Sequence, residues 1–319
     1  MKAMGLIVGG IIGCGALAPM AGADEPSMAA QSGSTAAPAT NAEQSVAISA
    51  WVAGQKPAIE TITGAKFRRD VPVKAVSVDE MAQLIAKTIE ADMAGAARPD
   101  GSPMSAIEIH VRATAAAFKV ATRTFGMYRY EDKTVYVVPE NVRTYAKRHG
   151  WSEQTVERTP RLAVAHELVH ALQDQTVALS ERSEKLGRER QHTLRVVSEG
   201  QAVWATDQLA KQLDWGAANS VLWGVVTGVQ AEGEPEKGGA PAAASQRVAP
   251  SAEAYTLGRA FVEYHLAWVG EGPKGTQRVW AILRNPPLNL GQIVDPGKCV
   301  VKAEGDAQKP GAPGAAGRP

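Results

Sequence analysis

Apolar residues recur mainly at intervals of three and four along this chain, which is the spacing of one face of an α-helix. In SVDEMAQLIAKTIEADM, Ser77 and Glu80 have the spacing of a helix capping box. The apolar residues that follow share one face: Met81, Leu84, Ile85 and Ile89. This pattern predicts an amphipathic helix that begins after Ser77.

Further helices are predicted on both sides of the middle of the chain. SAIEIHVRATAAAFKVA is expected to turn Ile107, Val111 and Phe118 toward the core. The remaining helices are expected at about residues 153–178, 184–213, 251–269 and 276–284. The chain is therefore expected to be mainly α-helical.

GMYRYEDKTVYVVPENV interrupts this pattern, because two apolar arms flank the polar residues EDK and the second arm is rich in strand formers. This favours a β-hairpin, so the predicted fold class is α+β. Near the end, NPPLNLGQIVDPG contains Pro286, Pro287 and Pro296 and is expected to be extended.

The two ends of the chain differ from its middle. Residues 1–23 combine an early lysine, a short apolar run and small residues, as export signals do. Cleavage after 23 and lipidation of Cys14 in a lipobox-like IIGC remain alternatives, with an uncleaved anchor as a third. Residues 24–45 are predicted to be a flexible linker, and 46–302 a single domain. A surface loop within that domain (232–250) and a terminal tail (303–319) share the small, polar composition of the linker.

Charge and cysteine content narrow the function. The chain has 34 basic and 33 acidic residues, a net charge of +1, so electrostatics gives no case for a nucleic-acid partner. A membrane contact is expected only through a lipid anchor at Cys14. Removal of the signal leaves Cys299 as the one remaining cysteine, which excludes an internal disulfide and a cysteine-built metal site.

The strongest chemical signal is the stretch AVAHELVHALQDQ, residues 163–175. His166 and His170 are one helical turn apart and can point at one metal ion, and the pattern H-E-x-x-H is typical of zinc hydrolases. Glu167 is then placed to take a proton from a water molecule at the metal. The alternative is a buried helix whose two histidines bond to the backbone.

A third ligand is expected in HTLRVVSEGQAVWATDQL, downstream of the motif. His192, Glu199 and Asp207 fall near one helical face, and only one of them can be level with the metal. We favour Glu199, because the small residues Gly200 and Ala202 would let this helix approach the His166 helix closely. Asp174 is either a partner that orients a ligand histidine or an ordinary exposed aspartate.

HELVHALQDQ followed by VSEGQAVW resembles the gluzincin class of zinc peptidases, and more narrowly a group of exported bacterial metallopeptidases. GMYRYEDKTVYVVPENV, YTLGRAFVEYHL and NPPLNLGQIVDP extend the resemblance over about residues 60–300. That group usually has histidine where this chain has Asp295, and tyrosine where it has Cys299. These departures argue against a role for the last stretch and leave the zinc residues unaffected.

The resemblance implies a zincin-like metallopeptidase domain, with a small sheet packed against helices that bind Zn2+ through His166, His170 and Glu199. It also implies that a substrate strand adds to a sheet edge, for which the arm Thr134–Val138 is the candidate. A tyrosine or histidine should donate to the oxyanion, and Tyr255 is favoured over His265.

The predicted function is hydrolysis of peptide bonds in a peptide or protein substrate, outside the cytoplasm, with Glu167 as general base. Two alternatives stay open: a zinc-binding envelope lipoprotein without turnover, and a zinc amidase with a non-protein substrate. The sequence leaves substrate specificity, oligomeric state and a pro-segment role for residues 46–100 undecided.

Overall fold

A computed structural model of the 319-residue chain describes residues 10–12, 40–98, 100–227, 250–268 and 272–299. These residues are mainly helical and include a small sheet, which confirms the predicted α+β, mainly α-helical class. The strands are β1 (Gly10–Ile12), β2 (Val73–Ala75), β3 (Thr124–Arg129) and β4 (Thr134–Val137). The helices are α1 (Asn41–Thr63), α2 (Val78–Met93), α3 (Ala106–Ala121), α4 (Pro139–His149), α5 (Glu153–Val177), α6 (Leu179–Glu184), α7 (Arg188–Gln212), α8 (Gly216–Thr227), α9 (Pro250–Trp268), α10 (Pro273–Arg284) and α11 (Leu290–Val294), with a 3-10 turn at Pro296–Lys298.

The predicted hairpin forms the centre of the sheet, whose strand order is β1-β3-β4-β2. β3 and β4 are antiparallel, with Met127 opposite Tyr136. β2 runs parallel to β4 on its other side, and β1 pairs antiparallel with β3. β4 is therefore an inner strand, and the outer side of β3 faces β1.

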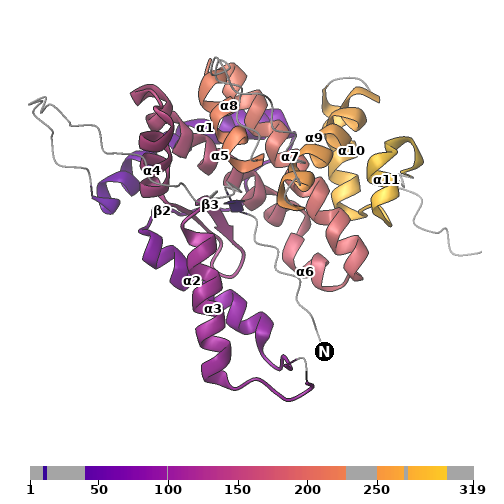
Figure 1. Cartoon of the computed structure of the whole chain (residues 1–319). Helices are drawn as coiled ribbons and strands as arrows, with labels where there is room; N and C mark the ends of the chain where they lie inside the picture. Colours follow the sequence, from indigo (N-terminus) through magenta and orange to yellow (C-terminus); the bar gives the residue numbers. More distant parts are fainter. Residues whose placement is uncertain (1–9, 13–39, 99, 228–249, 269–271, 300–319) are drawn as a thin grey trace, which may run out of the picture.

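The long helix α5 packs against β3 and β4 on one side and against α1, α7 and α8 on others. Figure 1 shows α5 near the middle of the molecule, with α9, α10 and α11 gathered beyond α7. The main apolar core lies between the sheet and these helices, and α1 contributes Ile48, Val52, Ile59 and Ile62 to it. The helix α1 is thus packed into the main core.

The helices α7 and α9 cross at two glycines. A methyl group built on Gly200 would lie 2.1 Å from the carbonyl carbon of Gly258, and one on Gly258 would lie 2.1 Å from the carbonyl oxygen of Val196. Gly200 was expected to let α7 approach the His166 helix, α5. This explanation is wrong, because Gly200 faces α9.

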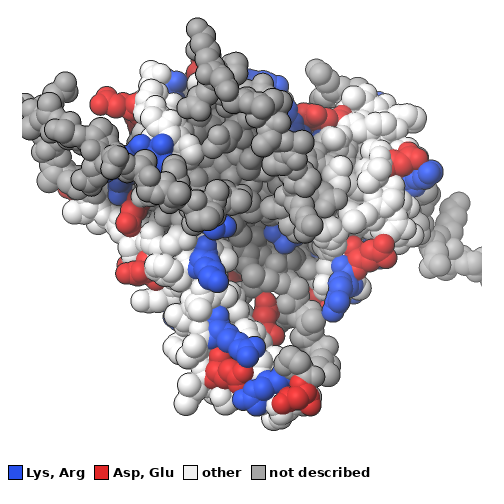
Figure 2. Space-filling model, in the orientation of Figure 1, with Lys and Arg blue, Asp and Glu red and all other residues white. Residues whose placement is uncertain are grey.

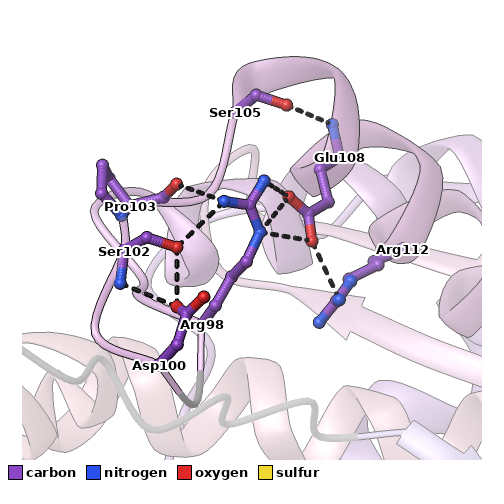
Figure 3. Close-up of polar contacts among 7 residues, drawn as sticks. All are labelled: Arg98, Asp100, Ser102, Pro103, Ser105, Glu108 and Arg112. Atoms are coloured by element: carbon purple, nitrogen blue, oxygen red, sulfur yellow. Dashed lines mark hydrogen bonds and ion pairs between the residues drawn. The ribbon is translucent and has the colours of Figure 1, made fainter.

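The helices α2 and α3 form a pair that projects from the rest of the molecule (Figure 1). As predicted, α2 opens with a capping box between Ser77 and Glu80. Figure 3 shows the connection between the two helices, where Arg98 donates to both carboxylate oxygens of Glu108, with Nε 3.0 Å from Oε2. Arg112 bonds the same carboxylate, at 2.9 Å. This network fastens the connecting segment to the first turns of α3.

The predicted inner face of α3 is wrong. Ile107, Val111 and Phe118 are 78%, 59% and 49% exposed. The side that packs against α2 is made of alanines instead: Ala113, Ala117 and Ala121. Small residues allow the two helices to approach closely, and the larger side chains lie on the exposed face of α3.

Three other boundaries differ from the prediction. α1 begins at Asn41 with a capping box from Thr40, so the segment 24–45 ends in a helix. The stretch 285–297 is not extended throughout, because α11 occupies five residues between Pro287 and Pro296, which flank a helix without interrupting it. The predicted signal (except β1), the rest of the linker, the loop 232–249 and the tail lie outside the described residues.

Acidic and basic side chains are interspersed over the described surface in Figure 2, in keeping with the near-zero net charge. Among the described residues, we find no helix that combines the length and the apolar character needed to cross a membrane.

Candidate metal centre

The motif HELVH lies in the most deeply buried part of α5. Ser152 caps the helix by accepting from the backbone of Thr155, and every residue from Leu162 to Asp174 is buried. A helix that is buried all round must satisfy its polar side chains within the protein. His166 and His170 therefore need partners in the interior.

Three donor atoms from α5 and α7 meet in a compact triangle. Nε2 of His166 lies 3.1 Å from Nε2 of His170, and Oε2 of Glu199 lies 3.2 and 3.3 Å from these two nitrogens. All three side chains are at most 2% exposed. The structure thus brings together the three residues predicted as ligands, and they can hold a metal ion.

The size of this triangle fits zinc. A tetrahedral zinc ion with ligand bonds of about 2.0–2.1 Å separates its ligand atoms by roughly 3.3 Å. The three observed separations are close to that value, and two imidazole nitrogens with one carboxylate form a ligand set of the catalytic type. The alternative was a buried helix whose two histidines bond to the backbone. The Nε2 atoms of His166 and His170 instead contact each other and Glu199.

The pKa values of the two histidines are shifted in opposite directions. Burial lowers the pKa of His166 to about 4, although the hydrogen bond to the Glu199 carboxylate acts in the opposite direction. Burial also disfavours a charge on His170, but the Glu199 carboxylate outweighs it and raises the pKa of His170 to about 9. The pKa of Glu199 falls well below its ordinary value, because the charge on His170 overcomes the effect of burial. Without a metal, His170 is therefore protonated and positively charged at neutral pH, whereas His166 is neutral.

Gln173 is a site residue that the sequence analysis missed. Its Oε1 lies 2.9 Å from Nδ1 of His170, and its Nε2 donates to the backbone oxygen of Ser198 and to Oε1 of Gln201, both at 2.9 Å. The signal was available, because Gln173 follows His166 by seven residues and His170 by three and thus shares their helix face.

Asp174 matches neither of the two alternatives proposed for it. It is buried, and its Oδ2 accepts from the hydroxyl of Tyr128 at 3.0 Å and from Nζ of Lys133 at 2.8 Å. It therefore joins α5 to the β3–β4 hairpin and does not orient a ligand histidine. Gln173 has that contact instead.

Glu167 points toward the sheet. Its Oε2 accepts from the backbone amide of Tyr128 at 2.7 Å, and its Cγ would lie 3.1 Å from a Cβ built on Gly126. The carboxylate also helps to raise the pKa of His170, so it lies close to the ligand group. Strand β3 thus holds the predicted base beside the candidate metal centre.

Tyr255 lies beside His166, with ring centroids 6.1 Å apart. Trp223 of α8 contacts both residues, at 5.5 Å from His166 and 6.0 Å from Tyr255. Asp207 fixes Trp223 by accepting from its indole at 2.8 Å, and Arg259 pairs with the same carboxylate. Asp207 is therefore a buried residue that holds Trp223 in place, and it is not part of the ligand group.

The other residues singled out by the sequence lie elsewhere. His192 is exposed on α7 and is not part of the ligand group. The ring of His265 packs against Phe261 and Tyr264, and its Nδ1 accepts from Arg278 at 3.0 Å. Asp295 pairs with Lys298 at the surface, and the Cys299 thiol is buried.

The prediction that Thr134–Val138 receives the substrate strand is wrong. β4 pairs with β3 on one side and with β2 on the other, so it has no open edge. Glu167 contacts β3 instead, through the backbone amide of Tyr128.

A hollow near the C-terminal part of α5 contains none of the predicted site residues. It is lined by Gly64, Ala65, Lys66, Arg68, Thr176, Gln277, Trp280 and Arg284.

Comparisons with known proteins add little to this picture. No protein-family model matches the chain, and no curated protein is significantly similar to it. A solved structure described as a putative hydrolase with a novel fold, from Chloroflexus aurantiacus, is 15% identical, with a TM-score of 0.46. The similarity covers 82% of this chain and 93% of that one. We therefore infer the function from the side chains of the site.

Proposed function

We propose that this chain is a zinc-dependent peptidase of the gluzincin type, with His166, His170 and Glu199 as ligands and Glu167 as general base. The observation that carries the proposal is the buried triangle of three donor atoms, with sides of 3.1 to 3.3 Å, next to a carboxylate held by β3. A protein that binds zinc without turnover would have no use for this additional carboxylate.

The donor set favours zinc among the common metals. Two imidazoles and one carboxylate suit zinc, whereas magnesium and calcium prefer sites made wholly of oxygen atoms. Bound zinc would supply a Lewis acid and lower the pKa of a water molecule. The three residues leave a fourth position for water or substrate, as catalytic zinc sites do.

The chain's own residues divide the remaining chemistry among them. Glu167 would accept the proton of the attacking water and later pass it to the leaving amine nitrogen. The Tyr128 amide fixes one oxygen of this carboxylate, which limits its rotation. Gln173 orients His170 so that Nε2 faces the ligand group.

The outer edge of β3 is the place where we propose that an extended peptide binds. This edge passes over Glu167 at Gly126, and β1 shows that it accepts an antiparallel strand, with Ile11 opposite Gly126. A peptide in that position would gain main-chain hydrogen bonds and place a peptide bond near the base. The side chains of β3 that meet this peptide would set its specificity.

We also propose that the protein is exported, on the composition of residues 1–23. Cleavage of that segment would remove β1 and leave the outer edge of β3 open to substrate.

The test is the metal content of the purified chain, compared with His166→Ala, Glu199→Ala and Glu167→Gln. We expect one zinc per chain, lost in the first two variants and kept in the third. His192→Ala is the matched control, since it removes an exposed histidine from α7 and should keep the metal. Cleavage of internally quenched random peptides should then depend on Glu167. A wild-type chain that takes up no zinc would overturn the proposal.

A further inference from the structure

Tyr130 carries a buried hydroxyl group that the contacts described above do not use. The residue directly follows β3 and begins the turn of the hairpin. Its hydroxyl oxygen is buried and makes no hydrogen bond within the part of the chain that the structure describes. A buried hydroxyl without a partner costs about 1–3 kcal/mol, and buried tyrosines usually find one. This exception therefore calls for a reason.

Tyr130 lies in the hairpin that packs against α5, and its electrostatic surroundings include carboxylates of the candidate metal centre. Burial raises the pKa of its phenol well above the ordinary value, and the carboxylates of Glu199, Asp174 and Glu167 raise it further. One of these is a proposed ligand and another the proposed base. The hydroxyl is thus close enough to both to respond to their charge, yet bonded to neither.

The hairpin holds Tyr130 in this place through contacts with α5. The Lys133 ammonium and the Tyr128 hydroxyl both bond to Asp174, one helical turn beyond His170. The ring of Tyr130 packs edge-on against that of Tyr128, with centroids 5.0 Å apart and an angle of 75°. The turn is therefore fixed to the helix that carries both histidines.

We infer that Tyr130 is a catalytic residue whose hydroxyl donates to the substrate carbonyl oxygen as negative charge develops on it. This inference rests on the proposed peptidase function. A buried donor without a partner of its own, in a hairpin that is bonded to the helix carrying both histidines, can bond a charge that appears only during the reaction, which is the condition for transition-state stabilisation. Tyr255 packs beside His166 and Trp223, whereas Tyr130 lies in the hairpin, directly after β3.

The deciding experiment compares Tyr130→Phe with Tyr136→Phe in the zinc-loaded chain. Tyr136 lies in the same hairpin, and its hydroxyl donates to Asp132, so it is a matched control. Loss of one oxyanion donor lowers kcat by roughly 10²–10³-fold. We expect a decrease of that order for Tyr130→Phe on internally quenched random peptides, with little change in KM or zinc content. Tyr136→Phe should match the wild type.

A second measurement is independent of turnover. A phosphinic peptide mimics the tetrahedral, negatively charged state, and calorimetry should show that Tyr130→Phe weakens its binding at least tenfold. Equal binding and equal kcat in Tyr130→Phe would overturn the inference. A changed visible spectrum of the cobalt-substituted variant would also overturn it, by making Tyr130 a metal ligand. Failure of the proposed function is distinct, because the wild type itself would then neither cleave peptides nor bind the phosphinic peptide.

Discussion

Nδ1 of His170 faces Oε1 of Gln173 at 2.9 Å, and the amide of Gln173 cannot turn over without losing two further bonds. Its Nε2 donates to two oxygens, those of Ser198 and Gln201, which would repel an amide oxygen in the same position. In the neutral form of His170, Nδ1 is therefore the protonated nitrogen, and Nε2 keeps a lone pair that faces His166 and Glu199.

Substitution of Gln173 should weaken zinc binding while the three ligands stay in place. Gln173→Leu keeps a side chain of similar size but removes the acceptor for His170. Loss of such a partner typically lowers metal affinity by roughly 10–100-fold, and we expect a decrease in that range in a competition titration with a chelator. Gln175→Leu is the control, since it removes a half-buried amide on the same helix that bonds the backbone of Arg68 and Arg69 and not the histidines. Unchanged affinity in Gln173→Leu would mean that Nε2 of His170 needs no such support.

The contact between Gly126 and Glu167 should control the position of the base. A methyl group at position 126 would lie 3.1 Å from Cγ of Glu167, so Gly126→Ala should displace the carboxylate by a few tenths of an ångström. We expect a clear decrease in kcat with unchanged zinc content, because catalysis is sensitive to small displacements. Gly54→Ala, in open space on α1, should behave as wild type. Full activity of Gly126→Ala would argue against a role for this contact.

Metal binding should release a proton at neutral pH. The pKa of His170 is about 9 and that of His166 about 4, so the metal-free site at pH 7 carries its proton on His170. Zinc must displace that proton, so the affinity should rise about tenfold per pH unit up to pH about 9. Calorimetry in two buffers of different ionisation enthalpy measures the release, and a value near zero at pH 7 would contradict the assignment.

The same shifts set the pH dependence of the metal-free fold. The raised pKa of His170 gives stability that is fully present below pH 6.5 and is lost as the pH rises through about 9. The lowered pKa of His166 gives the opposite dependence, with stability lost as the pH falls from 6.5 toward 4. Chemical unfolding should therefore show a maximum near neutral pH. Zinc should remove the alkaline decrease, because it takes the place of the His170 proton.

The two faces of α3 should respond differently to substitution. Ala117→Leu places a large side chain in the packed face against α2 and should destabilise the fold by about 1–3 kcal/mol. Ile107→Gln changes a side chain that is 78% exposed and should alter stability by less than about 0.5 kcal/mol. Urea unfolding measures both, and the reverse order would restore the face predicted from the sequence.

This reversal on α3 shows where sequence patterns stop being informative. Ile107, Val111 and Phe118 have the spacing of an inward face, and the alanines that pack instead share a helical spacing of their own. Periodicity identifies a helix face, but the choice between two faces depends on which neighbour packs against it. The prediction assumed that the larger residues would be covered.

The cluster of proposed ligands was predictable because the information is local. His166, Glu167 and His170 lie within five residues, and one turn of helix determines how they are arranged. Glu199 required only a second helix with a carboxylate at the right level. The spacing of Gln173 places it on the face of the two histidines, but its bonds to Ser198 and Gln201 form only in the folded chain. The surroundings of Tyr130 likewise depend on how the hairpin packs against α5.

The crossing of α7 and α9 makes two distant positions depend on each other. Gly200 directly follows Glu199, and its backbone touches that of Gly258 with no side chain between them. The contact is between two backbones, so no side chain can rotate to make room for an added methyl group. A larger residue at either glycine must therefore displace a whole helix. The position of the Glu199 carboxylate is thus tied to Gly258, a residue 59 positions further along the chain. In a variant library, we expect positions 200 and 258 to behave as a single site.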